Sequence, residues 1–167
     1  MKMRLTIALA MALMLVATLA LPAVAVQEDT RTASVTVNSF VSISLSAGNI
    51  VFSDVTPPVT GQGASGQVNG TPAVTITIEA ETNGDVDIGI KGAITTGTLA
   101  LANWKYSTSF IGTKTSIPLA YGSPVYTAAI PGSVNAFYHW IDVPVSTDSG
   151  SHSITVTYKA VPTGTPF

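Results

Sequence analysis

Residues 73–91 read AVTITIEAETNGDVDIGIK, and this stretch decides the fold class. Apolar side chains occupy every second position from Val74 to Ala80 and again from Val86 to Ile90. Alternation with a period of two is typical of β-strands that are buried on one face. We therefore expect two strands here, separated by Thr82-Asn83-Gly84.

The parity of the two runs predicts how they pair. A tight two-residue turn would place Ala80 opposite Asp87, and so would mix apolar and charged side chains on one face of the sheet. A three-residue loop, Thr82-Asn83-Gly84, instead places Ile78 opposite Ile88. The sequence therefore predicts a hairpin with the longer loop.

The same register brings carboxylates together on the outer face of the hairpin. It sets Glu81 opposite Asp85 and Glu79 opposite Asp87. Like charges directly opposite each other destabilise a sheet, and a hard cation with oxygen ligands relieves the repulsion. Calcium binding by these four residues is one hypothesis. Its alternatives are solvated, screened carboxylates, and two strands that belong to different sheets and never pair.

Alternation continues along the chain, and no window after residue 25 has the spacing of an amphipathic helix. Residues 57–72 are rich in Gly and Pro and are expected to form a loop. Their GQGASG motif at 61–66 therefore lacks the strand and helix that a dinucleotide site requires. About eight strands predict an all-β fold, an immunoglobulin-like or jelly-roll sandwich. The expected strands are 35–47, 49–55, 74–80, 86–90, 99–106, 117–121, 125–129, 136–143 and 152–161.

The first 25 residues have the features of a secretory signal peptide. Lys2 and Arg4 precede an uncharged apolar run from Leu5 to Leu21, and the small-residue motif Ala23-Val24-Ala25 follows. We expect cleavage after Ala25, which leaves residues 26–167 as a secreted domain without a membrane anchor. An uncleaved anchor is the alternative, because the apolar run is long enough to span a bilayer.

Composition narrows the partners of the secreted domain. Residues 26–167 hold five Lys and Arg against nine Asp and Glu, a net charge of −4. No basic stripe is present to neutralise phosphates, so we expect no nucleic-acid partner. The chain has no cysteine, which leaves stability to packing and to sheet hydrogen bonds.

Candidate sites for chemistry are few. The G-x-S-x-G motif is absent. His139 and His152 lie on expected strands, and His139 is close to Asp142 in sequence, but a triad requires convergence in space. We therefore name no catalytic residues and require no cofactor beyond the hypothetical calcium. A secreted hydrolase is the third interpretation of the chain.

Two surface features have binding and structural interpretations. The aromatic residues Trp104, Tyr106, Tyr138 and Trp140 form either a platform for a surface polysaccharide or part of the core. Asn69-Gly70-Thr71 is an N-glycosylation sequon, and Pro72 directly after it leaves modification of Asn69 open.

The start of the secreted domain has two interpretations as well. Residues 26–34 are a polar leader, and an alternating strand follows within 26–47. Such a strand pairs either within its own domain or with the open edge of another copy. Head-to-tail exchange does not close, so it produces a filament. The apolar donor side chains would be Val35, Val37, Val41, Ile43 and Leu45.

Four stretches in order resemble a family of secreted filament subunits. They are ASVTVNSFVSISL (33–45), NIVFSDVTPP (49–58), TNGDVDIGIKG (82–92) and FYHWIDVPVSTDSGSHSITVTYKA (137–160). This arrangement is similar to the TasA/camelysin-like β-sandwich proteins and to the smaller archaeal bundling pilins. The resemblance implies a homopolymer that assembles by donor-strand complementation into a biofilm-matrix fibre or pilus. The bacterial members are longer and carry helical insertions that this chain lacks, so no protease activity is carried over from the camelysins.

The sequence thus predicts a secreted structural subunit of an extracellular filament that is not an enzyme. The alternative is a monomeric surface or carbohydrate-binding β-sandwich module.

Overall fold

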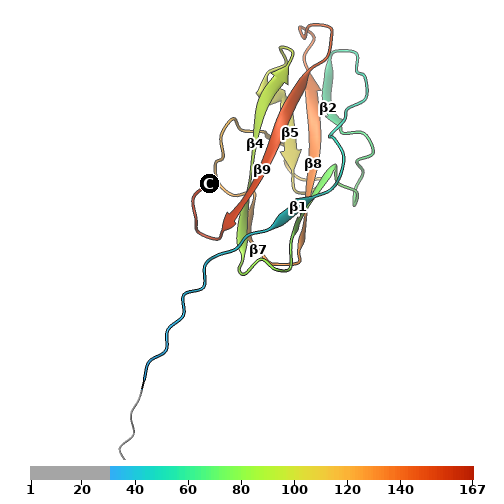
Figure 1. Cartoon of the computed structure of the whole chain (residues 1–167). Coiled ribbons are helices and arrows are strands. Elements are labelled where there is room, and N and C mark those ends of the chain that lie inside the picture. The colour runs from blue at the N-terminus through green and yellow to red at the C-terminus, as the bar shows by residue number, and fades with distance from the viewer. Residues whose placement is uncertain (1–30) are drawn as a thin grey trace, which may run out of the picture. The chain divides into compact units, whose positions relative to one another are not determined.

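The apolar alternations of the sequence form two antiparallel sheets that make a β-sandwich (Figure 1). The computed structural model describes residues 31–167. The unit from Val37 to Phe167 holds all the strands, and residues 31–36 contain none. The predicted all-β sandwich is confirmed. The signal peptide and its cleavage point after Ala25 lie outside the described residues.

Nine strands and one short 3-10 turn make up the described part of the chain. They are β1 (Ile43–Leu45), β2 (Val59–Gly63), β3 (Val74–Ile78), β4 (Val86–Thr96), η1 (Leu101–Asn103), β5 (Trp104–Ser107), β6 (Thr115–Ser116), β7 (Tyr126–Ala129), β8 (Val134–Val143) and β9 (Ser153–Pro162). Over residues 31–167, no helix has the length and hydropathy needed to cross a membrane.

The two sheets differ in size. The larger one has six strands in the order β1-β3-β8-β5-β6, and β2 pairs with β8 beyond the end of β3. The register places Val74 of β3 opposite Phe137, and Gly63 of β2 opposite Trp140. The smaller sheet has only three strands, in the order β7-β4-β9.

The core lies between the inner faces of the sheets. Its most deeply buried members include Ile76 and Ile78 of β3, Val86 and Ile88 of β4, and Phe137 of β8, each with none of its surface exposed. These side chains form one cluster. Burial of such aliphatic and aromatic side chains stabilises the fold by roughly 1.5–3 kcal/mol each.

The hairpin predicted over residues 74–90 is wrong. β3 pairs with β1 and β8, whereas β4 pairs with β7 and β9, so the two strands belong to different sheets. Their apolar side chains meet through the core instead of lying side by side on one sheet. The three-residue loop and its facing pairs are therefore not formed.

Thr82 and Asn83 do not form the predicted hairpin loop. Their side chains instead bind the backbone of residues 38–42. The Asn83 side chain accepts a hydrogen bond from the Phe40 N–H and donates one to the Asn38 carbonyl, both at 2.7 Å. The Thr82 hydroxyl accepts from the Ser42 N–H at 3.0 Å and is within 3.1 Å of the Ser42 carbonyl. These bonds align residues 38–42 with residues 82 and 83, beyond the end of β3.

Several predicted boundaries change for identifiable reasons. Residues 35–47 form a strand only at 43–45, where β3 offers a partner, while 49–55 and 117–121 form none. The predicted loop 57–72 contains β2, because this segment pairs with β8 through a bulge. Gly61 has a φ of 67° there, a conformation that glycine adopts without strain.

Asp87 is buried in the smaller sheet and not on an outer face as predicted. Its carboxylate accepts hydrogen bonds from the Ala128 N–H at 3.0 Å, the Gly164 N–H at 3.1 Å and the Thr163 hydroxyl at 3.3 Å. The backbone bonds from Ala128 and Gly164 lower the pKa of Asp87. One carboxylate thus joins β4 to β7 and to the turn that follows β9.

We predict that Asp87→Ala lowers the free energy of unfolding by about 1.5–3 kcal/mol, because it removes the charged acceptor of two backbone N–H groups and one hydroxyl. Denaturant unfolding of the chain 26–167 at pH 7 measures this. The matched control is Asp85→Ala, whose side chain is exposed and which should change stability by less than about 0.5 kcal/mol. Equal losses in the two variants would contradict the role given to Asp87.

Candidate functional site

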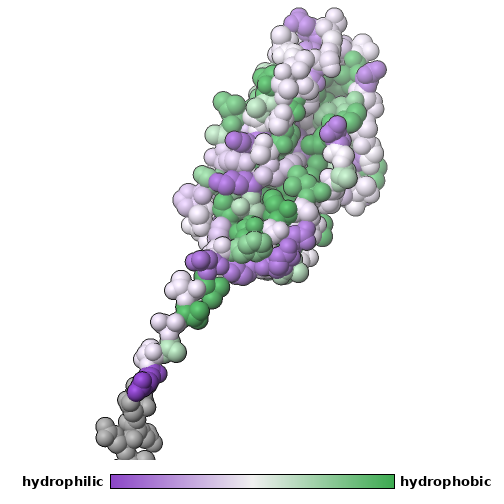
Figure 2. Space-filling model, viewed as in Figure 1, coloured by the Kyte–Doolittle hydropathy of each residue, from purple (hydrophilic) through white to green (hydrophobic). Residues whose placement is uncertain are grey.

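An open groove lies between β9 and the segment that links β1 to β2. Its volume is about 990 Å³. One wall is residues 45–57 and the other is residues 147–158. Figure 2 shows apolar residues, in green, in the recessed strip beside β9. The buried side chains that line the groove are Val74, Leu99, Trp104, Ile117, His139, Ile141 and Val143.

One edge of β9 is unpaired along this groove. β9 pairs with β4 from Pro162 to Ser153, and no other strand of residues 31–167 pairs with it. An unpaired edge presents a row of N–H and C=O groups, and another strand can form hydrogen bonds with them and so extend the sheet. Long edges are usually protected by charge or proline, but β9 carries only Lys159 and a terminal Pro162 over its ten residues.

The opposite wall is apolar but is not part of a sheet. Residues 49–56 run without helix, strand, turn or bend. Ile50 and Phe52 pack against the core, whereas Val51 between them is 56% exposed. Within residues 31–167, the one backbone–backbone hydrogen bond of this segment joins the Ser65 N–H to the Val51 carbonyl at 2.7 Å. Side-chain packing therefore holds this wall more than main-chain pairing does.

His139 is the titratable group buried most deeply in the groove lining, with 2% of its surface exposed. Its Nε2 lies 2.8 Å from the Tyr158 hydroxyl. The Gln67 side chain accepts from the His139 N–H at 2.6 Å and donates to the His139 carbonyl at 2.9 Å, which fixes the backbone here. Burial lowers the pKa of His139 to about 4, so the imidazole is neutral at pH 7.

Trp104 contributes an unpaired donor to the same lining. It is 7% exposed, and its ring packs edge-on against Phe52 with the ring centroids 5.8 Å apart. Among the buried side-chain polar atoms of residues 31–167, only the Trp104 indole nitrogen lacks a hydrogen-bond partner. An unsatisfied buried donor is rare and costs free energy, so packing in this part of the sandwich is incomplete.

The five predicted donor side chains divide into two groups. Val41 and Ile43 pack against the core of their own domain, and β1 places Ile43 opposite Ile78 and Leu45 opposite Ile76. Val35 and Val37 are 87% and 75% exposed and lie outside any strand. The first strand of residues 31–167 therefore pairs within its own domain at 43–45, and the segment open to another copy is shorter than predicted.

The four predicted calcium ligands are not brought together. Asp87 is buried under the C-terminal turn, while Glu81 and Asp85 are exposed and Glu79 is half-buried. In residues 31–167, no three His, Cys, Asp or Glu side chains are placed to share a metal ion. The pairing that motivated the calcium hypothesis is absent, because β3 and β4 lie in different sheets.

The four aromatic residues do not form one platform. Trp104 and Tyr106 of β5 pack on the core between the sheets. Tyr138 and Trp140 of β8 point to the opposite side of the larger sheet, where Phe110 covers them with ring centroids 5.7 and 6.2 Å away. Three of the four are less than 8% exposed, which favours the packing interpretation.

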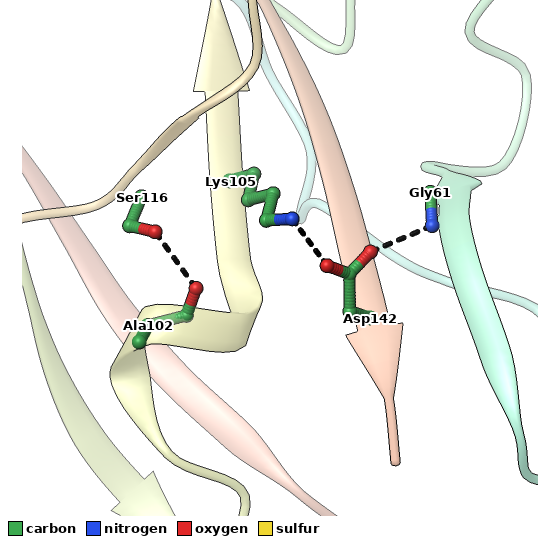
Figure 3. A network of polar contacts seen from close by, with 5 residues as sticks. All are labelled: Gly61, Ala102, Lys105, Ser116 and Asp142. Atoms are coloured by element: carbon green, nitrogen blue, oxygen red, sulfur yellow. Dashed lines mark hydrogen bonds and ion pairs between the residues drawn. The ribbon is translucent and has the colours of Figure 1, made fainter.

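Asp142 is not a partner of His139. It forms an ion pair with Lys105 of β5 and accepts a hydrogen bond from the Gly61 N–H at 2.7 Å (Figure 3). Burial opposes ionisation of this carboxyl group, but these two contacts outweigh burial and lower its pKa. The Asp142 carboxylate thus joins β8 to β5 through the ion pair and to β2 through the Gly61 hydrogen bond.

The sequon at Asn69 lies in an exposed turn. Val68 and Thr71 exchange two backbone hydrogen bonds around Asn69 and Gly70, and the φ of Gly70 is 87°. Asn69 is accessible to modification in this position, and its glycosylation stays a prediction.

Sequence reasoning missed the groove. Its lining comes from segments that are distant in the chain, and nothing in a local pattern places residues 45–57 opposite β9. One signal was present, since the short apolar run at 49–55 predicts a strand and the structure gives that segment no strand partner.

Comparison with known proteins assigns this chain to no family. No protein-family model matches the sequence, and no significant match is found among curated proteins or solved structures. Function is therefore argued from the groove and the segments around it.

We predict that acidification from pH 6.5 to 4 destabilises the domain through His139. The unfolded histidine binds its proton near pH 6.5, while the folded one resists protonation down to about pH 4, so stability falls over this window. The expected loss is about 3 kcal/mol, at about 1.4 kcal/mol per pH unit.

Unfolding of His139→Gln at pH 7 and pH 4.5 tests this prediction, because glutamine is uncharged at both values. The variant should lose most of the pH dependence within this window, whereas the control His152→Gln should keep it. An unchanged profile in His139→Gln would show that other groups cause the acid loss.

Proposed function

We propose that this protein is the secreted structural subunit of an extracellular filament, in which the N-terminal segment of one copy inserts into the groove of the next. The observation that supports this most is the unpaired edge of β9 beside an apolar groove. Strand addition at such an edge gains main-chain hydrogen bonds, and alternate side chains determine its register.

The N-terminal segment has the chemistry of a suitable occupant. Ala33, Val35 and Val37 alternate with Ser34 and Thr36. In an extended strand the first set points to one face and the second to the other. The valines would contact the apolar lining of the groove while the hydroxyl side chains remain in solvent.

The residues that follow this segment are held by their own domain. Leu45 lines the groove, and the chain before it is bonded to Asn83 at Phe40 and Asn38. Insertion of the segment into a second copy leaves these bonds in place, and repeated insertion builds an open chain of subunits.

The resemblance to TasA/camelysin-like proteins and archaeal bundling pilins agrees with this proposal and motivates the homopolymer. It supports an extracellular, biofilm-matrix or pilus location and a role without catalysis. Both the filament and its location are proposals.

We predict that Val35→Asp/Val37→Asp abolishes filaments of the chain 26–167, because charged groups cannot be desolvated in the apolar groove without a large cost. Negative-stain electron microscopy and sedimentation at neutral pH measure assembly. The matched control, Ser34→Asp/Thr36→Asp, adds the same charge at positions expected to face solvent and should still polymerise.

Filaments in the valine double variant would contradict donation by this segment. A wild-type protein that stays monomeric under all assembly conditions would favour the alternative of a monomeric surface module.

A further inference from the structure

The wall of the groove formed by residues 49–55 has a strand pattern but lacks a strand partner. Ile50 and Phe52 are directed to the core, and Val51 is directed to solvent, as in a strand buried on one face. The missing element is a neighbour for its backbone. This contrast between pattern and structure suggests that the neighbour is supplied from outside the domain.

The backbone directions in this segment indicate where that neighbour lies. In an extended chain, the N–H and C=O of one residue point to the same side, and the next residue points its groups to the other side. The Val51 carbonyl accepts from Ser65. With the segment extended, the N–H and C=O groups of Ile50 and Phe52 would point away from Ser65, and both residues line the groove, whose other wall is β9.

Two incomplete edges thus border one groove. The edge of β9 lacks a partner in residues 31–167, and in the same part of the chain Ile50 and Phe52 form no backbone–backbone hydrogen bond. Trp104, whose buried indole N–H is unpaired, also lines this groove. A single inserted strand has two edges, so it can form main-chain hydrogen bonds with both walls of the groove at once.

We propose that residues 49–55 form a strand only when the groove is filled, so that the donated segment of a second copy pairs with β9 on one side and with Ile50 and Phe52 on the other. This inference rests on the proposed function and specifies its acceptor site. The inserted strand would link the two sheets along their open side and remove the exposed edge of β9.

Amide hydrogen exchange tests this proposal. The sample is the chain 26–167 with Val35→Asp/Val37→Asp, ¹⁵N-labelled, with and without a synthetic peptide of residues 26–40. The peptide should slow exchange at the amides of Ile50 and Phe52 by about 100-fold or more, since stable main-chain hydrogen bonds protect amides from exchange. The amide of Val51 points the other way and serves as the control within the same segment.

A peptide with the same two Val→Asp substitutions is the matched control and should leave all these amides unchanged. Peptide binding with protection in β9 but none at Ile50 and Phe52 would overturn the two-sided site while leaving filament formation intact. Absence of peptide binding, together with a wild-type chain that forms no filaments, would overturn both the proposed function and this inference.

Discussion

A sheet of three strands cannot cover the inner face of a sheet of six, and most features of this domain depend on that mismatch. Apolar side chains gain free energy roughly in proportion to the area removed from water, so uncovered core positions require another cover. Here the irregular segment 46–57 provides part of this cover, because Ile50, Phe52 and Val55 pack against the core. Because that cover is not a strand, a groove and an unpaired edge remain beside it.

The fold class was predictable because the period-two alternation is a property of single segments. The strands predicted at 74–80, 125–129, 136–143 and 152–161 match β3, β7, β8 and β9 to within a few residues. The partners of each strand were not predictable in the same way. The parity argument for the hairpin was consistent within itself, but it did not include the bonds from Thr82 and Asn83 to residues 38–42.

The candidate site was harder to predict because its residues acquire their role only through tertiary contacts. Asp87 was one of the four residues of the calcium hypothesis, yet its oxygens accept hydrogen bonds from N–H and hydroxyl donors of residues 128, 163 and 164. Val35 and Val37 were identified as apolar donor positions, but their exposure could be known only once β1 was seen to begin at Ile43. The chemical character of each side chain could be read from the sequence, whereas the residues that it contacts in the folded domain could not.

The bonds that align residues 38–46 with β3 and with residues 82 and 83 have a mechanical consequence. They include the Asn83 and Thr82 contacts, the pairs from Ile43 to Leu45, and the Ser46 N–H to the Thr75 carbonyl at 2.9 Å. Hydrogen bonds between antiparallel strands lie perpendicular to the strand axis. A pull on the chain from its N-terminal side, directed along this segment, would load these bonds together in shear and would not unzip them one at a time. A subunit held by its N-terminal segment would therefore transmit tension directly into β3 and the centre of the larger sheet.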